Sequence, residues 1–245
     1  MNLSKFNLSI VIPTYKEKKN FLHLINNLHS NIKISKKNYQ IIFVDDNSKD
    51  GIEDVFKKIK YKFKNINLIV RRHKPRDLSK SCIYGFERSL FENILVMDAD
   101  MQHNPKYINK MIKNFIDSEC DILVGVRDFD NKKMINLNIF RFIASKFIIA
   151  IIHFFLGKIT SDPMSGFFLF KKFFYKRVKN KLDARGYKIL FDILYSQTEE
   201  IKLQEYKIKF DKRRDNKSKM SYKILVILLK QILFKFLAKN FFYSK

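Results

Sequence analysis

The sequence predicts an α/β fold with a mostly parallel sheet and helices on both faces, because short apolar runs alternate with segments of helical periodicity. Five runs are rich in β-branched residues and have the length of buried strands: 8–12, 39–44, 67–70, 94–97 and 121–126. The segments between them carry apolar residues at helical spacing. Strands that alternate with helices form parallel sheets covered on both faces.

Polar residues follow three of these runs at their carboxyl ends. The first run ends in PTYKE, the second in DDNSKDG and the fourth in DADMQ. Open α/β sheets bind ligands at the edge where the carboxyl ends of the strands meet. Neither a G-x-G-x-x-G nor a P-loop sequence follows the first run, which disfavours a dinucleotide-binding or P-loop fold. We therefore expect a ligand site of another kind at this edge.

The fourth run ends in two aspartates one residue apart. In a strand, Asp98 and Asp100 would share a face about 7 Å apart, and Gln102 would join them if the chain stays extended. Two like charges there are costly without a cation, and carboxylate and amide oxygens suit Mg²⁺ or Mn²⁺. The alternative is a turn and helix cap, since Asp and Asn-Pro favour turns. His103 points away from Gln102 in this geometry and is interpreted as structural.

Composition limits the class of protein. A chain of 245 residues with 46% hydrophobic and 30% charged residues fits one packed domain, alone or with an appendage. The net charge of +25 is compatible with nucleic acid, an anionic membrane surface or phosphorylated substrates, and also with a bias toward residues of A/T-rich codons. The two cysteines form no zinc spacing, which indicates a reducing compartment, and no signal peptide is expected.

Two apolar segments are too short or too interrupted to span a bilayer. The first, 147–156, reads FIIAIIHFFL between basic residues, and its His153 is interpreted as a core histidine. The second, 223–239, has an incomplete polar stripe formed by Lys230, Gln231, Lys235 and Lys239. Both segments fit amphipathic helices that lie in a membrane interface with lysines reaching the headgroups. Ordinary core helices are the alternative.

Seven motifs carry a resemblance to a known family. In order they are IVIPTYKE (10–17), VDDNSKDG (44–51), RDLSKSCIYGF (76–86), MDADMQHNP (97–105), GVR (125–127), SDPMSGF (161–167) and FDKRRDNKSKMS (210–221). Together they resemble glycosyltransferase family two, and within it the dolichol-phosphate mannosyltransferase group. The resemblance covers most of the chain, from residue 10 to about residue 222.

This resemblance implies a GT-A fold and a metal-dependent, inverting transfer of mannose from GDP-mannose to a dolichyl-type polyprenyl monophosphate, with Mg²⁺ or Mn²⁺ as cofactor. The expected organisation is a GT-A domain over 1–222, with an interface helix near 139–157, and a C-terminal amphipathic helix over 223–245. The expected location is peripheral, at the cytoplasmic face of the membrane. A membrane-protein partner is neither implied nor excluded.

The resemblance also assigns roles to individual residues. The positions that hold the nucleoside are matched by Pro13, Tyr15, Glu17, Val44 and Asp46. The diphosphate positions are matched by Asp98, Ala99, Asp100 and Gln102, of which Asp98, Asp100 and Gln102 would bind the metal. The positions that contact donor or lipid phosphate are matched by Arg127, Arg141 and Ser145. The basic pair that closes over the donor is matched by Arg213 and Lys219.

Two positions depart from the family pattern, which usually has Asn where Lys16 stands and Gly where Asn216 stands. Asparagine tolerates left-handed backbone, so the second departure is mild, whereas Lys16 leaves the nucleobase preference open.

The expected chemistry needs cations around the leaving diphosphate. A divalent ion at the two aspartates, with Arg213 and Lys219, would stabilise the charge that develops there, so Asp100 and this basic pair are the catalytic candidates. A lipid phosphate has a second pKa of about 6 and needs no strong general base. Asp162 is a further candidate that could orient the acceptor or the sugar. A turn aspartate before Pro163 is the alternative for Asp162.

Three rival functions remain open on the sequence. One is transfer of glucose or another sugar from a UDP-sugar to polyprenyl phosphate or a different acceptor. Another is a basic nucleic-acid-binding protein, against which stands the lack of any RNP-type, zinc-finger or DNA-binding motif; no nucleic-acid partner is therefore expected. The third is a family member without activity. We also expect removal of 223–245 to release the protein from liposomes and largely spare donor binding.

Overall fold

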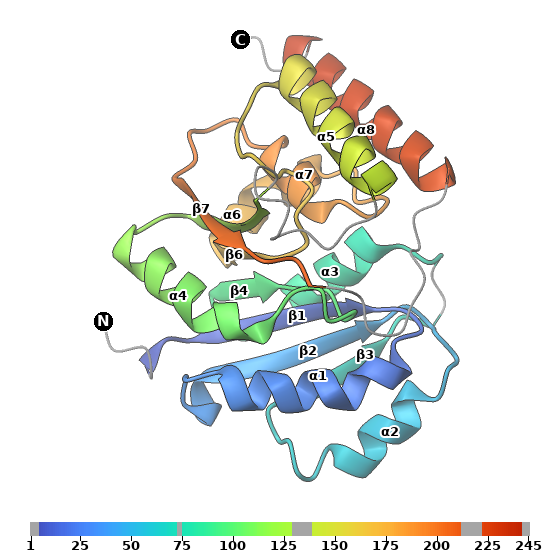
Figure 1. Ribbon diagram of the computed structural model, residues 1–245, viewed down its shortest axis with the longest axis vertical. Helices are drawn as coiled ribbons and strands as arrows, with labels where there is room; N and C mark the ends of the chain where they lie inside the picture. The colour runs from blue at the N-terminus through green and yellow to red at the C-terminus, as the bar shows by residue number, and fades with distance from the viewer. Residues whose placement is uncertain (1–4, 73–74, 129–138, 212–221, 242–245) are drawn as a thin grey trace.

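The computed structural model describes residues 5–72, 75–128, 139–211 and 222–241, and it forms a mixed α/β structure (Figure 1). Within these residues the strands form one seven-stranded sheet in the order β3-β2-β1-β4-β6-β5-β7. The strands are β1 (Leu8–Thr14), β2 (Tyr39–Asp45), β3 (Ile66–Val70), β4 (Asn93–Val96), β5 (Ile122–Arg127), β6 (Phe168–Lys171) and β7 (Leu203–Ile208). The first five confirm the predicted strands to within two residues at each end.

The sheet is mostly parallel, as predicted. Strands β1 to β4 pair in parallel, and β7 is parallel to β5. Strand β6 is the exception, because it runs antiparallel to both of its neighbours, β4 and β5. The sequence did not predict β6 or β7.

Helices cover both faces of the sheet. They are α1 (Lys18–Asn31), α2 (Ile52–Ile59), α3 (Leu78–Glu87), α4 (Ile108–Asp117), α5 (Ile139–Leu156), α6 (Lys172–Val178), α7 (Ile189–Leu194) and α8 (Tyr222–Phe241). Helices α1, α2 and α4 share one apolar cluster with the sheet, whereas α3, α6 and α7 share another. Strand β1 contributes residues to both clusters, since Ile10 and Ile12 belong to the first and Val11 to the second. This alternation follows from the two-residue period of a strand.

Helices α5 and α8 form an outer pair that lies side by side beyond α7 (Figure 1). They are held by a third apolar cluster that includes Ile152 of α5, Phe191 of α7 and Ile232 of α8. No helix in the described part of the chain is both long and apolar enough to cross a membrane.

Helix α8 buries two polar side chains beside its apolar contacts and exposes several large apolar ones. Gln231 and Lys235, from the predicted polar stripe, are buried against the protein, with only 3% and 4% of their surfaces exposed. On the opposite side Leu233 and Phe234 are 57% and 55% exposed. A helix at a water-facing surface normally buries its apolar stripe. The outer side of α8 is therefore apolar.

The strand order brings four loops to one edge of the sheet. The carboxyl ends of β1, β2 and β4 meet there, because these strands are adjacent and parallel. Since β6 is antiparallel, with Phe168 opposite Val96, its amino end lies at the same edge. The loop before β6 therefore joins the loops after β1, β2 and β4.

Candidate active site

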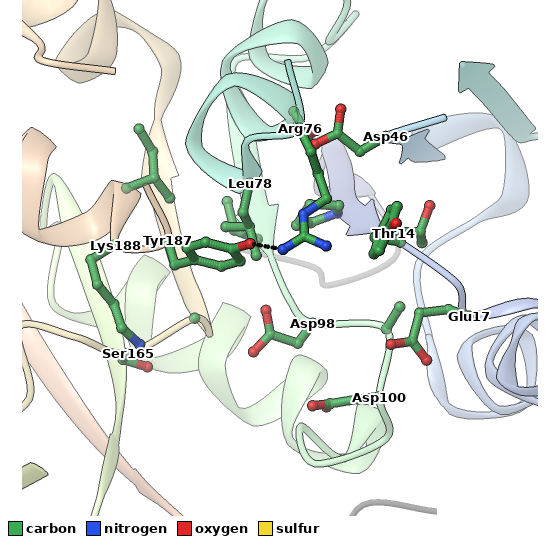
Figure 2. A pocket seen from close by; sticks show the side chains of 17 residues that line it. Thr14, Glu17, Asp46, Arg76, Leu78, Asp98, Asp100, Ser165, Tyr187 and Lys188 are labelled. Carbon is green, nitrogen blue, oxygen red and sulfur yellow. Dashed lines mark hydrogen bonds between the residues drawn. The ribbon is translucent and has the colours of Figure 1, made fainter. Parts of the chain in front are cut away.

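A pocket opens at this edge, and polar side chains from several loops point into it (Figure 2). Most of the residues that the family resemblance assigned to the donor line it: Pro13, Tyr15, Glu17, Asp46, Asp98, Ala99 and Asp100. Val44 and Gln102, by contrast, are buried and do not line the pocket. Two stretches widely separated in the sequence complete the wall, one at Arg76 and Leu78 and the other at 187–189.

The loop after β1 makes a tight turn at Lys16. This residue has a φ of 56°, which is the left-handed region that asparagine adopts more readily than lysine. Its backbone N–H donates to Ser48 Oγ at 2.7 Å, and the Ser48 hydroxyl in turn donates to Asp45. This turn gives a physical reason for the asparagine that the family usually has here. Lys16 accordingly affects this site through backbone strain as well as through its charge.

Asp46 follows β2 and is fixed by two hydrogen bonds. Arg71 Nη1 donates to Oδ1 at 2.6 Å, and the backbone N–H of Asp77 donates to Oδ2 at 2.5 Å. Burial raises the pKa of Asp46, while the Asp77 N–H and the Arg71 guanidinium act in the opposite direction. The segment between β3 and α3 thus holds the Asp46 side chain, which lines the pocket, in a single orientation.

Asp98 and Asp100 follow β4, and both carboxylates point into the pocket (Figure 2). The backbone N–H of Asp98 donates to Nδ1 of His103 at 3.0 Å, and the backbone N–H of Gln102 donates to Oδ1 of Asp100 at 3.1 Å. These local hydrogen bonds close the chain into a turn after β4, so the strand does not stay extended to Gln102. The predicted turn is therefore present, and the two aspartates that are the candidate ligands lie within it.

His103 stabilises this turn by accepting the hydrogen bond from Asp98. It is buried, its ring stacks on Phe167 with centroids 5.2 Å apart, and Phe210 meets it edge-on. Burial, with the nearby Arg127 charge, lowers the pKa of His103 to about 4. A neutral ring is what the contact with Asp98 requires, because Nδ1 accepts the hydrogen bond. The contacts agree with the structural role predicted for His103.

Gly166 leaves room for the carboxylate of Asp98. A Cβ atom at residue 166 would lie 2.8 Å from Oδ2 of Asp98 and 3.0 Å from Oδ1. The loop before β6 therefore sets how far the Asp98 side chain can turn.

The two aspartates fit a divalent cation, and the role of Gln102 as a third ligand stays a prediction. The side-chain amide of Gln102 is turned away toward residue 211, where its Nε2 donates to the carbonyl of Asp211 at 3.2 Å. The described residues contain no cluster of three His, Cys, Asp or Glu side chains that could hold a metal. Mg²⁺ is commonly bound by one or two carboxylates plus substrate phosphates and water, a pattern that needs no third protein ligand. Asp98 and Asp100 satisfy it.

Arg127 and Asp162 form a bidentate pair. Nε and Nη2 of Arg127 donate to the two carboxylate oxygens of Asp162 at 2.6 and 2.7 Å. Asp162 is completely buried. An arginine held by both ends of a carboxylate has a fixed orientation. This geometry indicates that Asp162 orients Arg127, and its predicted role in orienting the acceptor or the sugar stays a prediction.

Arg76, Tyr187 and Lys188 are among the pocket residues to which the sequence analysis gave no role. Arg76 Nη2 donates to the hydroxyl of Tyr187 at 2.7 Å (Figure 2). The guanidinium of Arg76 also lies 4.5 Å from the centre of the Tyr15 ring. Lys188 donates to the carbonyl of Met164 at 3.1 Å and lines the same wall. Arg76 stands in a quoted motif but was given no role. The segment at 185–188, R-G-Y-K, carries a glycine with a φ of 87°, and this turn before α7 was the available signal.

Some predicted residues fall outside the described part of the chain. These are Arg213 and Lys219, together with the departure at Asn216, and the side chain of Arg141 is also not described. Ser145 lies on α5 and is half-buried. The roles assigned to these residues stay predictions.

Comparisons with known proteins agree with the motifs. Residues 9–179 match the family model described as glycosyl transferase family 2. Over 229 residues the chain is 33% identical to a dolichol-phosphate mannosyltransferase of Pyrococcus furiosus, covering 92% of this chain and 62% of that protein. It is 29% identical over 250 residues to the protein of the same name from Saccharomyces cerevisiae, covering 95% of this chain and 89% of the yeast protein.

Solved structures share the fold at low sequence identity. Glucosyl-3-phosphoglycerate synthase from Mycobacterium tuberculosis, in complex with Mn²⁺, uridine diphosphate and glucosyl-3-phosphoglycerate, superposes with a TM-score of 0.66 at 12% identity, over 96% of this chain and 80% of that one. S. aureus TarS in complex with UDP-GlcNAc gives 0.65 at 16% identity, over 98% and 69%. The predicted GT-A arrangement is thus confirmed. With its two aspartates after β4 in the pocket of this fold, the chain belongs to glycosyl transferase family 2.

Proposed function

We propose that this protein transfers mannose from GDP-mannose to a polyprenyl monophosphate at a membrane surface, with Mg²⁺ or Mn²⁺ bound at Asp98 and Asp100. The observation that supports it most directly is the pocket in which Asp46 and Tyr15 line one part and the two aspartates another. The names of the Pyrococcus and yeast relatives supply the sugar and the lipid acceptor.

The pocket suggests how each part of the donor is held. Tyr15 offers a ring face to the base, and Asp46 offers carboxylate oxygens in a fixed orientation. The diphosphate would lie against Asp98 and Asp100, where a divalent cation would act as a Lewis acid toward the leaving group. Arg127, which the resemblance assigned to the donor or lipid phosphate, is held in one orientation by Asp162.

The acceptor needs little help from a general base. A phosphate monoester has a second pKa of about 6, so at neutral pH a polyprenyl phosphate is mostly a dianion and can attack the anomeric carbon directly. A single displacement of this kind inverts the anomeric centre. The protein's task is then to orient the two phosphates and to keep the positive charges in place.

The outer helix pair supports a membrane-bound acceptor. Of the twelve large apolar side chains exposed in the described part of the chain, nine lie on two helices, α5 and α8. They are Ile143, Phe147, Phe154, Phe155, Ile227, Leu229, Leu233, Phe234 and Leu237. We call this surface the apolar outer face. An apolar surface gathered in one place marks an interaction site, and a bilayer is the occupant that matches a polyprenyl acceptor.

The net charge of the chain also favours a bilayer as the occupant of this face. The chain carries a net charge of +25, which favours anionic lipid, and Lys230 stands within the outer side of α8, where its long side chain can reach the headgroups. We therefore propose peripheral binding at the cytoplasmic face of the membrane, with α5 and α8 lying in the interface.

The donor is tested by side-by-side binding of GDP-mannose and UDP-glucose, followed by transfer to polyprenyl phosphate in liposomes. We expect tighter binding of GDP-mannose and transfer of mannose. Tighter binding of UDP-glucose would support the rival UDP-sugar transferase, for which Lys16 leaves room. A protein that transfers no sugar from either donor would contradict the proposal.

Membrane binding is tested by replacing residues of the apolar outer face. Leu233→Gln with Phe234→Gln should weaken sedimentation with anionic liposomes and slow transfer to the lipid acceptor, while donor binding in solution changes little. Leu90→Gln is the matched control, because Leu90 is 77% exposed and lies outside α5 and α8. Equal liposome binding by all three proteins would mean that another partner, such as a membrane protein, covers this face.

A further inference from the structure

The inner side of α8 carries a buried ion pair that the proposed reaction does not use. Nζ of Lys235 lies 2.7 Å from Oδ1 of Asp192, and the two side chains are 3% and 0% exposed. Lys235 also donates to the carbonyl of Lys181 at 3.2 Å and to the hydroxyl of Ser196. Burying two charges gives little net stabilisation over an apolar pair of the same volume. The arrangement therefore calls for a reason beyond stability.

Asp192 does more than neutralise Lys235. Its two oxygens also accept hydrogen bonds from the backbone N–H groups of Asp183, at 3.2 Å, and Ala184, at 2.8 Å. One turn before Lys235 on α8, Gln231 donates its side-chain amide to the carbonyl of Arg185 at 2.7 Å. Helices α7 and α8 thus hold three consecutive residues, 183–185, from one side. We call 183–188 the pocket loop.

Residues at the start of α3, next to the pocket, hold Gly186 of the pocket loop. The backbone N–H of Gly186 donates to Oδ2 of Asp77 at 2.6 Å, and the N–H of Ser79 donates to the carbonyl of Gly186 at 3.0 Å. The backbone N–H of Asp77 is the group that fixes Asp46. The next two residues of the pocket loop, Tyr187 and Lys188, enter the pocket wall (Figure 2). A continuous set of hydrogen bonds therefore joins α8 to the donor pocket.

We propose that Lys235 is a positioning residue: through Asp192 it holds the pocket loop against the donor site, so that seating of α8 and binding of the donor are thermodynamically linked. The proposal rests on the proposed function for the identity of donor and membrane.

The link has a direction. In the structure the seated α8 presents its apolar residues beside those of α5, and the proposal is that a bilayer binds this state more tightly than one in which α8 has moved away. Lipid would then strengthen donor binding, and donor would strengthen lipid binding by the same factor, because coupling between two ligands is reciprocal.

Two variants of α8 separate this role from helix packing in general. Lys235→Met removes the charge that reaches Asp192. Lys239→Met is the matched control: Lys239 lies one turn further along the same side of α8, and its Nζ donates to the carbonyl of Leu156 at the end of α5, not to the pocket loop. A double variant, Asp192→Leu with Lys235→Met, replaces the pair by apolar side chains and avoids a lone buried charge.

Hydrogen–deuterium exchange of the whole protein without ligand gives the first readout. We expect faster exchange across 183–188 in Lys235→Met and in the double variant, and wild-type exchange there in Lys239→Met. This measurement needs no donor, so it decides the role of Lys235 even if the proposed donor is wrong.

Donor affinity gives the second readout, measured with GDP-mannose by calorimetry, with and without vesicles of phosphatidylcholine and phosphatidylglycerol in equal parts. For wild type and Lys239→Met we expect the vesicles to tighten donor binding by at least about fivefold, the lower end of ordinary coupling factors. For Lys235→Met and the double variant we expect a ratio near one. UDP-glucose is titrated in parallel. If the wild-type protein prefers UDP-glucose, the proposed donor is wrong, but the effect of vesicles on donor affinity can still be measured with UDP-glucose.

Two results would overturn the proposal. One is that Lys235→Met and Lys239→Met show the same hydrogen–deuterium exchange across 183–188 and the same change in donor affinity on addition of vesicles. The other is a double variant with wild-type exchange and donor affinity, because the pair would then act only on stability.

Discussion

Gly166→Ala tests whether the carboxylate of Asp98 must lie where the structure places it. The new Cβ would be 2.8 Å from Oδ2 of Asp98, whereas ordinary contacts begin near 3.4 Å, so the carboxylate must retreat by 3.4 − 2.8 = 0.6 Å. The backbone of Gly166 is not left-handed, so alanine brings no strain of its own. The contact is with the far end of a flexible side chain that is 34% exposed, so moving it costs the fold little.

The effect on catalysis should be much larger than the effect on stability. Misplacing a reacting or positioning group by about 1 Å costs roughly 100-fold in rate. A shift of about 0.6 Å on the same scale corresponds to about 10–100-fold in kcat/KM, or about 1.4–2.7 kcal/mol.

The assay is mannose transfer with saturating divalent metal, together with denaturant unfolding of the same preparations. Gly85→Ala is the contrasting variant, because its Cβ would lie 2.4 Å from Cγ1 of Val11 in the core and should lower the free energy of unfolding. The reasoning fails if Gly166→Ala keeps its kcat/KM within twofold of wild type. It also fails if this variant loses as much stability as Gly85→Ala.

Three further outcomes are expected. Asp100→Asn, or excess chelator, should abolish transfer with the fold intact, since the aspartates repel an incoming diphosphate without a cation; full activity in chelator would contradict this. Arg213→Ala and Lys219→Ala should each cost about 2–4 kcal/mol, mainly in kcat, so a rise in KM alone would count against their role. Burial lowers the pKa of His29 below 6.5, so the unfolded chain takes up the proton first, and the free energy of unfolding should fall as the pH drops through 6.5. Its slope over that range should be smaller in His29→Gln, and equal slopes would refute the assignment.

Four of the five predicted strands, β1, β2, β4 and β5, lie inside the sheet as apolar runs, and the fifth, β3, lies at its edge. Every residue of β1 and of β2 is buried, so their sequences are continuous and apolar enough to recognise. Strand β7 is at the edge of the sheet, and its sequence LQEYKI exposes Gln204 and Glu205, so it has no such run. Strand β6 lies within a stretch of phenylalanines that continues directly into α6, and no turn residue marks the change.

The pocket shows a similar division. Tyr15, Asp46, Asp98 and Asp100 were assigned because they stand in motifs at strand ends, and they do meet in one pocket. Lys188 was not assigned, because its place in the pocket depends on a loop far along the chain that packs against the start of α3. The family motif could not show that Gln102 turns toward Asp211, since that depends on a contact 109 residues away.

Helix α8 shows the limit of periodicity. A polar stripe can be located from the sequence, but the pattern does not say which side of the helix faces the protein. Here Lys235 has a buried partner in Asp192, so Gln231 and Lys235 face inward. Lys230 and Lys239 of the same predicted stripe, by contrast, are exposed. This also revises the expectation for removal of 223–245: on the hydrogen bonds described above, we now expect the deletion to weaken donor binding as well as liposome binding.

The apolar outer face also sets how this protein behaves in a lipid-free buffer. At low ionic strength the net charge of +25 keeps molecules apart. Salt shortens the range of that repulsion to about 8 Å at physiological strength, and two outer faces can then meet and exclude water. Added salt should therefore promote self-association in solution while it weakens attachment to anionic vesicles. Dilute salt or mild detergent is the condition in which single molecules persist.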